Sequence, residues 1–169
     1  FNKNSRRTPS KTNVRRDSSM TPIDRLEDEL VETPAHEIFS NLGYEPLIGA
    51  QLRSEREISD AILKSRLDKK IRELNPNLPE EVYRITLSKV VSLQSPTIMG
   101  NNQEFQQMLL AGVKVSHQGQ KGTESYAVKI IDFQTSTNND FAAVRQLTFQ
   151  KNKTVKAIRT DHILFVNGL

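Results

Sequence analysis

The spacing of apolar residues changes at Val113, and this change limits the folds open to the chain. Before Val113, apolar residues recur every three or four positions, as at Ile58 and Ile62, which is typical of helices with one buried face. After it they alternate with other residues, as at Tyr126 and Val128, which is typical of half-buried strands. The sequence therefore predicts a domain of helices followed by strands.

The first part of the chain predicts four main helices and one short strand. Because proline removes a backbone donor and clashes with the preceding turn, Pro34 is expected to break or kink a first helical stretch that opens at Thr21. A helix is then expected at about 35–42, where Gly43 ends it. A strand follows at 44–49, and the remaining helices are expected at 54–74, 82–91 and 102–110.

The last part predicts strands separated by polar turns. They are expected at 113–115, 126–131, 141–150, 154–159 and 162–166, with turns at 117–122 and 151–153 and a polar loop at 134–140. The last strand is apolar throughout, as in strands buried on both faces. Asn167-Gly168 is a strong hairpin signal, but only Leu169 follows it. We therefore expect the sequence to be incomplete at both ends.

The positive charge is concentrated in the first 20 residues. They carry six Lys or Arg and one Asp, for a charge of +5, whereas the whole chain carries +4. Residues 21–169 therefore sum to −1, and net charge gives the folded part no support as a nucleic-acid binder. With few apolar residues, residues 1–20 are expected to be a disordered tail or, alternatively, a basic arm that binds a partner. The predicted domain is residues 21–169.

Several chemistries have no residues to support them. There is no Cys, which excludes disulfides and thiolate catalysis, and His36, His117 and His162 are not at metal-ligand spacing. No Gly-rich phosphate loop or nucleophile elbow is present. The chain has no run of about 18 apolar residues and no secretory signal, so the sequence predicts neither a membrane partner nor export. These features fit an intracellular protein.

Carboxylates and cations near the last strands are the remaining candidates. Asp161 lies at the entrance to the apolar strand, where a rigid carboxylate could bind Mg²⁺, or it could be an ordinary strand-edge residue. Glu32 belongs to an acidic stretch whose simplest interpretation is a solvated helix face. Lys151 and Lys153 flank a hairpin and could contact phosphates or protect a strand edge.

Three C-terminal segments resemble a known family. VKIID at 128–132, NNDFAAVRQLTF at 138–149 and IRTDHILFVNGL at 158–169 are similar to the N-terminal nuclease domain of the R (HsdR) subunit of type I restriction enzymes. Thr160 stands where the family usually has Pro. Upstream, Glu32 with the segments 42–44, 58–67, 74–76 and 102–113 extends the resemblance to about 25–169. The matching C-terminal residues are Asn139, Phe141, Gln146, Arg159, Asp161, Phe165, Val166, Asn167, Gly168 and Leu169.

This resemblance implies an α/β fold of the PD-(D/E)XK nuclease type, with a mixed sheet flanked by helices. It implies a type I site-specific deoxyribonuclease in which Asp161 and Glu32 bind Mg²⁺, with Arg159, Lys151 and Lys153 as DNA contacts. The family's second catalytic strand, with Glu-x-Lys, would follow Leu169, so these residues alone are expected to be inactive.

The resemblance also implies partners and a compartment. The substrate would be double-stranded DNA, cut after ATP-driven translocation by a part of the subunit outside this sequence, together with methylation and specificity subunits in a bacterial or archaeal cytoplasm. The alternative is a catalytically dead nuclease-fold module for DNA binding or subunit docking, which Thr160 in place of Pro leaves open. Glu-x-Lys after Leu169 would favour the enzyme.

Overall fold

A computed structural model describes residues 26, 28–119 and 122–169 of the chain. The basic tail expected at 1–20 and the helix start expected at Thr21 lie outside the described residues. No helix in the described part is long and apolar enough to cross a membrane.

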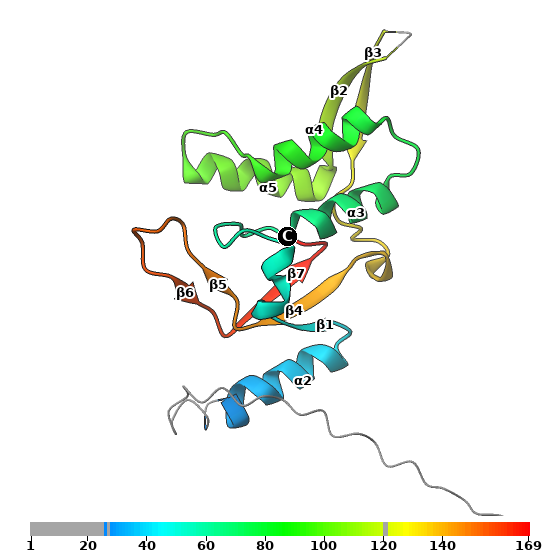
Figure 1. Cartoon of the computed structure of the whole chain (residues 1–169). Coiled ribbons are helices and arrows are strands. Elements are labelled where there is room, and N and C mark those ends of the chain that lie inside the picture. The colour runs from blue at the N-terminus through cyan, green and yellow to red at the C-terminus, as the bar shows by residue number, and fades with distance from the viewer. Residues whose placement is uncertain (1–25, 27, 120–121) are drawn as a thin grey trace, which may run out of the picture.

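Helices and strands follow the predicted change of period (Figure 1). The helical elements are η1 (Asp28–Glu32, a π turn), α2 (Thr33–Asn41), η2 (Gly49–Ser54), α3 (Lys64–Leu74), α4 (Glu80–Val91), α5 (Ile98–Ala111) and η3 (Ser136–Asn138). The strands are β1 (Glu45–Ile48), β2 (Val113–Gly119), β3 (Gly122–Val128), β4 (Phe141–Arg145), β5 (Thr148–Phe149), β6 (Ile158–Arg159) and β7 (His162–Val166). Pro34 lies in the first turn of α2, where its missing N–H is tolerated, directly after the π turn.

The predicted helix at 54–74 begins ten residues too early, since α3 starts at Lys64. The residues before it lie across the sheet, and their carbonyls are used in tertiary contacts. The carbonyl of Ile58 accepts from the Gln150 N–H at 3.1 Å, and Arg56 donates to the carbonyls of Ile58 and Asp60. Carbonyls engaged in this way do not form the regular ladder of a helix.

The predicted strand at 141–150 is also wrong, because Gln146 divides it into β4 and β5. Gln146 has a φ of +57°, a left-handed conformation that no strand continues through. The predicted strand at 154–159 reduces to the two residues of β6, which pair with β5. Conversely, the turn expected at 117–122 is shorter, since β2 and β3 pair as far as Gly119 and Gly122.

A mixed three-stranded sheet forms the centre of the fold, as expected. Its strand order is β1-β4-β7, with β1 parallel and β7 antiparallel to β4. Helices α2 and α3 lie on opposite sides of this sheet (Figure 1). The expectation that β7 is buried on both faces is wrong, because β7 is an edge strand within the described sheet and Leu164 is 41% exposed.

Two apolar clusters fill the interior and meet at α3. One cluster lies between the sheet and the residues before α3, and it includes Leu52, Leu63, Val144, Leu147 and Phe165. The other lies among α3, α4, α5 and the β2-β3 hairpin. Its buried members are Leu67, Ile71, Val82, Tyr83, Val90, Met108, Val113, Val115, Val128 and Ile130. Since Leu63 and Leu67 are one helical turn apart, α3 joins the two clusters.

Candidate functional site

Gln146 lies where the central strand ends, and it contacts both predicted metal-binding residues. Its backbone N–H donates to the carbonyl of Asp161 at 2.9 Å. Its side-chain Nε2 donates to Oε2 of Glu32, also at 2.9 Å. The left-handed backbone of Gln146 allows both contacts, because it turns the chain out of the strand at this point. Glu32 at the end of η1 and Asp161 directly before β7 therefore both contact Gln146, the first through its side chain and the second through its backbone.

Gly49 supports this turn through a close backbone approach. A Cβ atom at Gly49 would lie 2.6 Å from the carbonyl oxygen of Gln146 and 2.8 Å from Cα of Leu147. Both distances are far below van der Waals contact, and both neighbours are backbone atoms that cannot move independently. Only glycine therefore fits at the end of β1 beside Gln146.

Glu32 and Asp161 have different surroundings. The Glu32 side chain is half-buried and accepts the hydrogen bond from Gln146, whereas the Asp161 side chain is exposed and makes no hydrogen bond or ion pair within the described residues. The same part of the chain has no group of three or more His, Cys, Asp or Glu residues that could hold a metal ion. The described residues thus supply the carboxylate of Glu32 at Gln146, the exposed carboxylate of Asp161, and no complete set of ligands.

Two histidines that sequence analysis did not select lie between α2 and the sheet. The rings of His36 and His162 are 5.5 Å apart. Burial, followed by the neighbouring His162 and Arg145, lowers the pKa of His36, which favours its neutral form. The position of each histidine beside a predicted metal ligand could have been read from the sequence, because His36 follows Glu32 by one helical turn and His162 follows Asp161 directly.

A basic pocket of about 530 Å³ opens beside Gln146. Its lining residues come from the end of β1, η2, the segment before α3, the turn at Gln146 and the β5-β6 pair. They are Ile48, Gly49, Ala50, Arg53, Arg56, Glu57, Ile58, Gln146, Thr148 and Arg159. The predicted DNA contact Arg159 therefore lines this pocket. The predicted contacts Lys151 and Lys153 do not, since both are exposed on the connection between β5 and β6.

Arg56 holds the wall of this pocket together. It donates to the carbonyls of Ile58, Asp60 and Thr148 at 2.9–3.2 Å, and its guanidinium carbon lies 4.6 Å from the centre of the Phe149 ring. These contacts join the segment before α3 to β5. The apolar spacing of this segment predicted the start of a helix, so the place of Arg56 in the pocket wall was not expected from the sequence.

Thr160 fastens the same region to the end of β4. Its N–H and its Oγ1 both donate to the carbonyl of Leu147, at 2.9 and 3.1 Å. The family that the sequence resembles usually has proline at this position, and proline could make neither bond. The substitution therefore changes how the residue before Asp161 is anchored.

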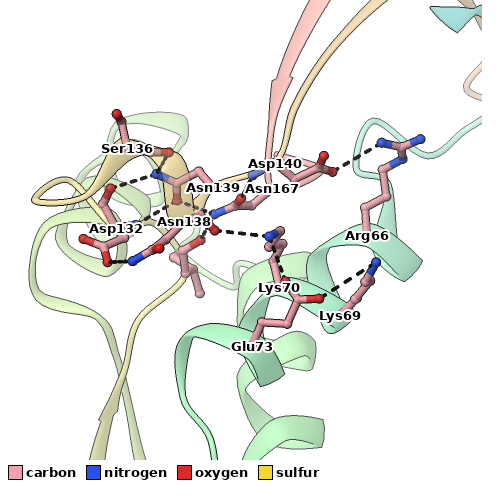
Figure 2. A network of polar contacts seen from close by, with 11 residues as sticks. Arg66, Lys69, Lys70, Glu73, Asp132, Ser136, Asn138, Asn139, Asp140 and Asn167 are labelled. Carbon is pink, nitrogen blue, oxygen red and sulfur yellow. Dashed lines mark hydrogen bonds and ion pairs between the residues drawn. The ribbon is translucent and has the colours of Figure 1, made fainter. Parts of the chain in front are cut away.

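Three of the motif residues, Asp132, Asn139 and Asn167, belong to a separate polar network (Figure 2). Asn139 accepts from the Asp132 N–H through Oδ1 and donates to the Asp132 carbonyl, at 2.9 and 2.8 Å. Asn167, fully buried with a φ of +56°, donates to Oδ1 of Asn139 and to the Ile130 carbonyl. It also accepts from the Asp140 N–H at 2.7 Å. These asparagines thus fix the loop 132–140 against the end of β7.

The carboxylate of Asp132 organises the same loop. It accepts from Nδ2 of Asn138 and from the N–H groups of Thr135 and Gln134, at 3.0–3.1 Å. The hydrogen bond from Asn138, followed by that from Thr135, lowers the pKa of Asp132. Asp132 is therefore a charged structural residue whose carboxylate hydrogen bonds all stay inside the loop.

The fold and the site define a mixed α/β protein with two carboxylates and a basic pocket at one end of its sheet. The chain belongs to the family described as type I restriction enzyme R protein N terminus, which matches residues 24–169.

Two relatives carry the same type of name. The chain is 33% identical over 150 residues to the "Putative type I restriction enzyme MjaIXP endonuclease subunit" of Methanocaldococcus jannaschii. It is 29% identical over 150 residues to the "Type I restriction enzyme HindI endonuclease subunit" of Haemophilus influenzae. Each match covers 85% of this chain but only 14% of the relative's length. No solved structure matches the chain.

Proposed function

We propose that this chain is part of the endonuclease region of a type I restriction R subunit, which hydrolyses double-stranded DNA with Mg²⁺. The observation that carries the proposal is that Gln146 joins the two predicted ligands: its side chain donates to the Glu32 carboxylate and its backbone N–H donates to the main-chain carbonyl of Asp161, each at 2.9 Å. Family membership and the names of both relatives support it. The fold would then be of the PD-(D/E)XK nuclease type.

The donor set at this site suits Mg²⁺ in kind. Glu32 and Asp161 offer carboxylate oxygens, which hard divalent cations prefer. These two residues would hold the ion, which when bound polarises the phosphate and lowers the pKa of a water molecule. Gln146 engages only one oxygen of Glu32, so the other oxygen is available for an ion.

The described residues need further ligands to complete such a site. The N–H groups of Val166 and Leu169 each donate to the other residue's carbonyl, at 3.2 and 3.0 Å, and so close a two-residue turn. Asn167 and Gly168 both have positive φ, as in a type I′ hairpin. We propose that in the intact subunit a strand carrying Glu-x-Lys pairs with β7 beyond this turn, and that residues 1–169 alone are inactive.

The remaining parts of the activity lie outside these residues. ATP binding and translocation would belong to other regions of the intact subunit, because the chain spans 14% of the length of its relatives. Methylation and specificity subunits would complete the complex in a bacterial or archaeal cytoplasm. Arg159, Lys151 and Lys153 would contact DNA phosphates.

The test is cleavage of plasmid DNA by the intact subunit in its complex. We expect Asp161→Asn and Glu32→Gln each to reduce cleavage by about a hundredfold or more, while ATP hydrolysis continues. Glu37→Gln is the matched control, because Glu37 is exposed on α2, the helix that follows Glu32 directly, and has no place in the site. Cleavage by Asp161→Asn at the rate of this control would refute the proposal.

The alternative is a docking module without catalysis, and one observation favours it. The outer side of η1 and α2 exposes large apolar side chains, including Ile38 at 58% and Leu42 at 69%. Apolar surface of this kind often marks a protein contact. In this case Asp161→Asn would leave cleavage unchanged, and Leu42→Glu would weaken assembly of the complex.

A further inference from the structure

Two arginines in the basic pocket have no partner among the residues that the structure describes. The side chains of Arg53 and Arg159 are exposed and make no hydrogen bond or ion pair within the described residues. They come from distant parts of the chain, Arg53 from η2 and Arg159 from β6. Two unpaired guanidinium groups on one concave surface are a suitable site for an anion, because each offers planar, forked donors.

The pocket is held in shape by other residues. Arg56 is the third arginine in its lining, but its donors are used on the carbonyls of Ile58, Asp60 and Thr148. Thr148 is also paired with Arg159 in the short β5-β6 ladder, so Arg56 and Arg159 are linked through one residue. Preformed walls reduce the entropy that binding must overcome.

The charge of the lining is positive. Glu57 is its only acidic residue, against Arg53, Arg56 and Arg159. The volume of about 530 Å³ is large enough for a phosphate group with its sugar. An anion of the size of one nucleotide therefore fits both the charge and the space.

The pocket also adjoins the carboxylate site. Gln146 lines the pocket and donates to Glu32, so the two features share a side chain. A strand lying across this end of the sheet could place one phosphate at the carboxylates and a neighbouring phosphate at the arginines.

We propose that Arg53 and Arg159 together bind one phosphodiester of the DNA strand, next to the phosphodiester that is cut. The inference rests on the proposed nuclease function and adds a subsite to it. The two arginines position the strand and take no part in bond breaking. Lys151 and Lys153, which lie outside the pocket, are not required for this subsite.

The experiment measures binding of a fluorescein-labelled duplex to the intact subunit in metal-free buffer, as a function of salt. The variants are Arg53→Gln, Arg159→Gln and the double variant. Arg84→Gln is the matched control, because Arg84 is exposed on α4 and paired with Glu81 instead of lining the pocket. All four variants remove positive charge from exposed side chains, and circular dichroism checks that each remains folded.

The expected result follows from the release of counterions. Loss of one phosphate contact lowers the salt slope by about 0.9 and weakens binding about eightfold at 0.1 M salt. We expect this full effect in the double variant, a partial loss in each single variant, and neither in Arg84→Gln. A double variant whose salt slope and affinity match those of Arg84→Gln would overturn the subsite. A salt slope lowered by about two in the double variant would mean that each arginine contacts its own phosphate, and would overturn the shared phosphate.

Two further arms separate the possible sources of failure. If free deoxynucleoside monophosphate displaces the duplex from the wild type but not from the double variant, the two ligands compete for the arginines and the subsite is supported. If the monophosphate binds the wild type without displacing the duplex, the pocket is a separate nucleotide site and the proposal is wrong. Asp161→Asn is measured in parallel for cleavage and for metal-free binding. If it loses cleavage while the arginine variants bind normally, only the subsite fails. If Asp161→Asn cleaves normally while the double arginine variant shows the lowered salt slope, the subsite holds as a DNA contact and the nuclease function fails.

Discussion

The side chain of Gln146 donates to the carboxylate of Glu32 at 2.9 Å, although 114 positions separate the two residues in the chain. Because the backbone N–H of Gln146 also donates to the main-chain carbonyl of Asp161, one residue holds the Glu32 carboxylate and the backbone of Asp161. Residues that orient a metal ligand in this way are often as important as the ligand itself.

Replacement of Gln146 tests this positioning role. We expect Gln146→Ala in the intact subunit to reduce cleavage about 10–100-fold and to raise the Mg²⁺ concentration needed for half-maximal rate. The shift in Mg²⁺ dependence is the informative readout, since a purely structural defect would lower the rate at every concentration. Gln146→Gly separates the side chain from the backbone, because glycine tolerates the left-handed φ. If both variants keep the wild-type Mg²⁺ dependence, Gln146 does not orient Glu32.

A methyl group at Gly49 should disturb the site from the side of β1. A Cβ atom there would meet the Gln146 carbonyl oxygen at 2.6 Å, so Gly49→Ala must displace the backbone of the turn. We expect a loss of about 1–3 kcal/mol in the free energy of unfolding, together with a loss of cleavage. Urea denaturation of the purified chain measures the first, and the plasmid assay measures the second. Wild-type values for both would show that the backbone can yield at this position.

The buried amide of Asn167 should be important for stability. Asn167→Ala removes the partners of the Asp140 N–H and the Ile130 carbonyl, and places alanine at a φ of +56°. We expect a loss of about 2–4 kcal/mol, because each buried polar group left without a partner costs about 1–3 kcal/mol. Asn167→Gly removes the same hydrogen bonds without the backbone strain, so it should be the milder variant in urea denaturation. Equal stability of the wild type and Asn167→Ala would contradict this role.

Asp132 should make stability depend on pH in the acid range. Its pKa in the folded chain is lowered, mainly by the hydrogen bond from Asn138, so its contribution is complete above the unfolded pKa of about 3.9. The contribution is lost as the pH falls from there through the folded pKa. We therefore expect the free energy of unfolding to decrease on acidification below about pH 4 more steeply in the wild type than in Asp132→Asn. Parallel curves for the two proteins would mean that the carboxylate has the same pKa in both states.

The sequence predicted the elements whose residues face one environment along their whole length. The helices α4 and α5 follow their apolar periods, because one side of each packs on the same cluster. The hairpin strands β2 and β3 were predicted with other bounds, because only their base, with Val113, Val115 and Val128, packs on that cluster and their outer parts are largely exposed. The start of α3 was mispredicted because the carbonyl of Ile58 accepts from the N–H of Gln150 and Arg56 donates to the carbonyl of Thr148, tertiary contacts that no local pattern encodes.

The candidate site was predictable only in part. The motif resemblance selected Glu32, Asp161 and Gln146, but nothing in their spacing indicated the left-handed backbone at Gln146, since glutamine rarely adopts it. Arg53 was missed because its position in the pocket depends on η2 folding beside β5 and β6. Lys151 and Lys153 were selected for their charge, and the structure places them outside the pocket.

The parallel pairing of β1 with β4 has a consequence for how the chain folds. Glu45 pairs with Ala142, so this half of the sheet closes a loop that contains α3, α4, α5 and the β2-β3 hairpin. Closing a long loop costs more chain entropy than forming a local hairpin, and contacts between distant residues form slowly. We therefore expect the helical cluster to be structured before the sheet, and Glu32, Gln146 and Asp161 to meet only in the last stage of folding.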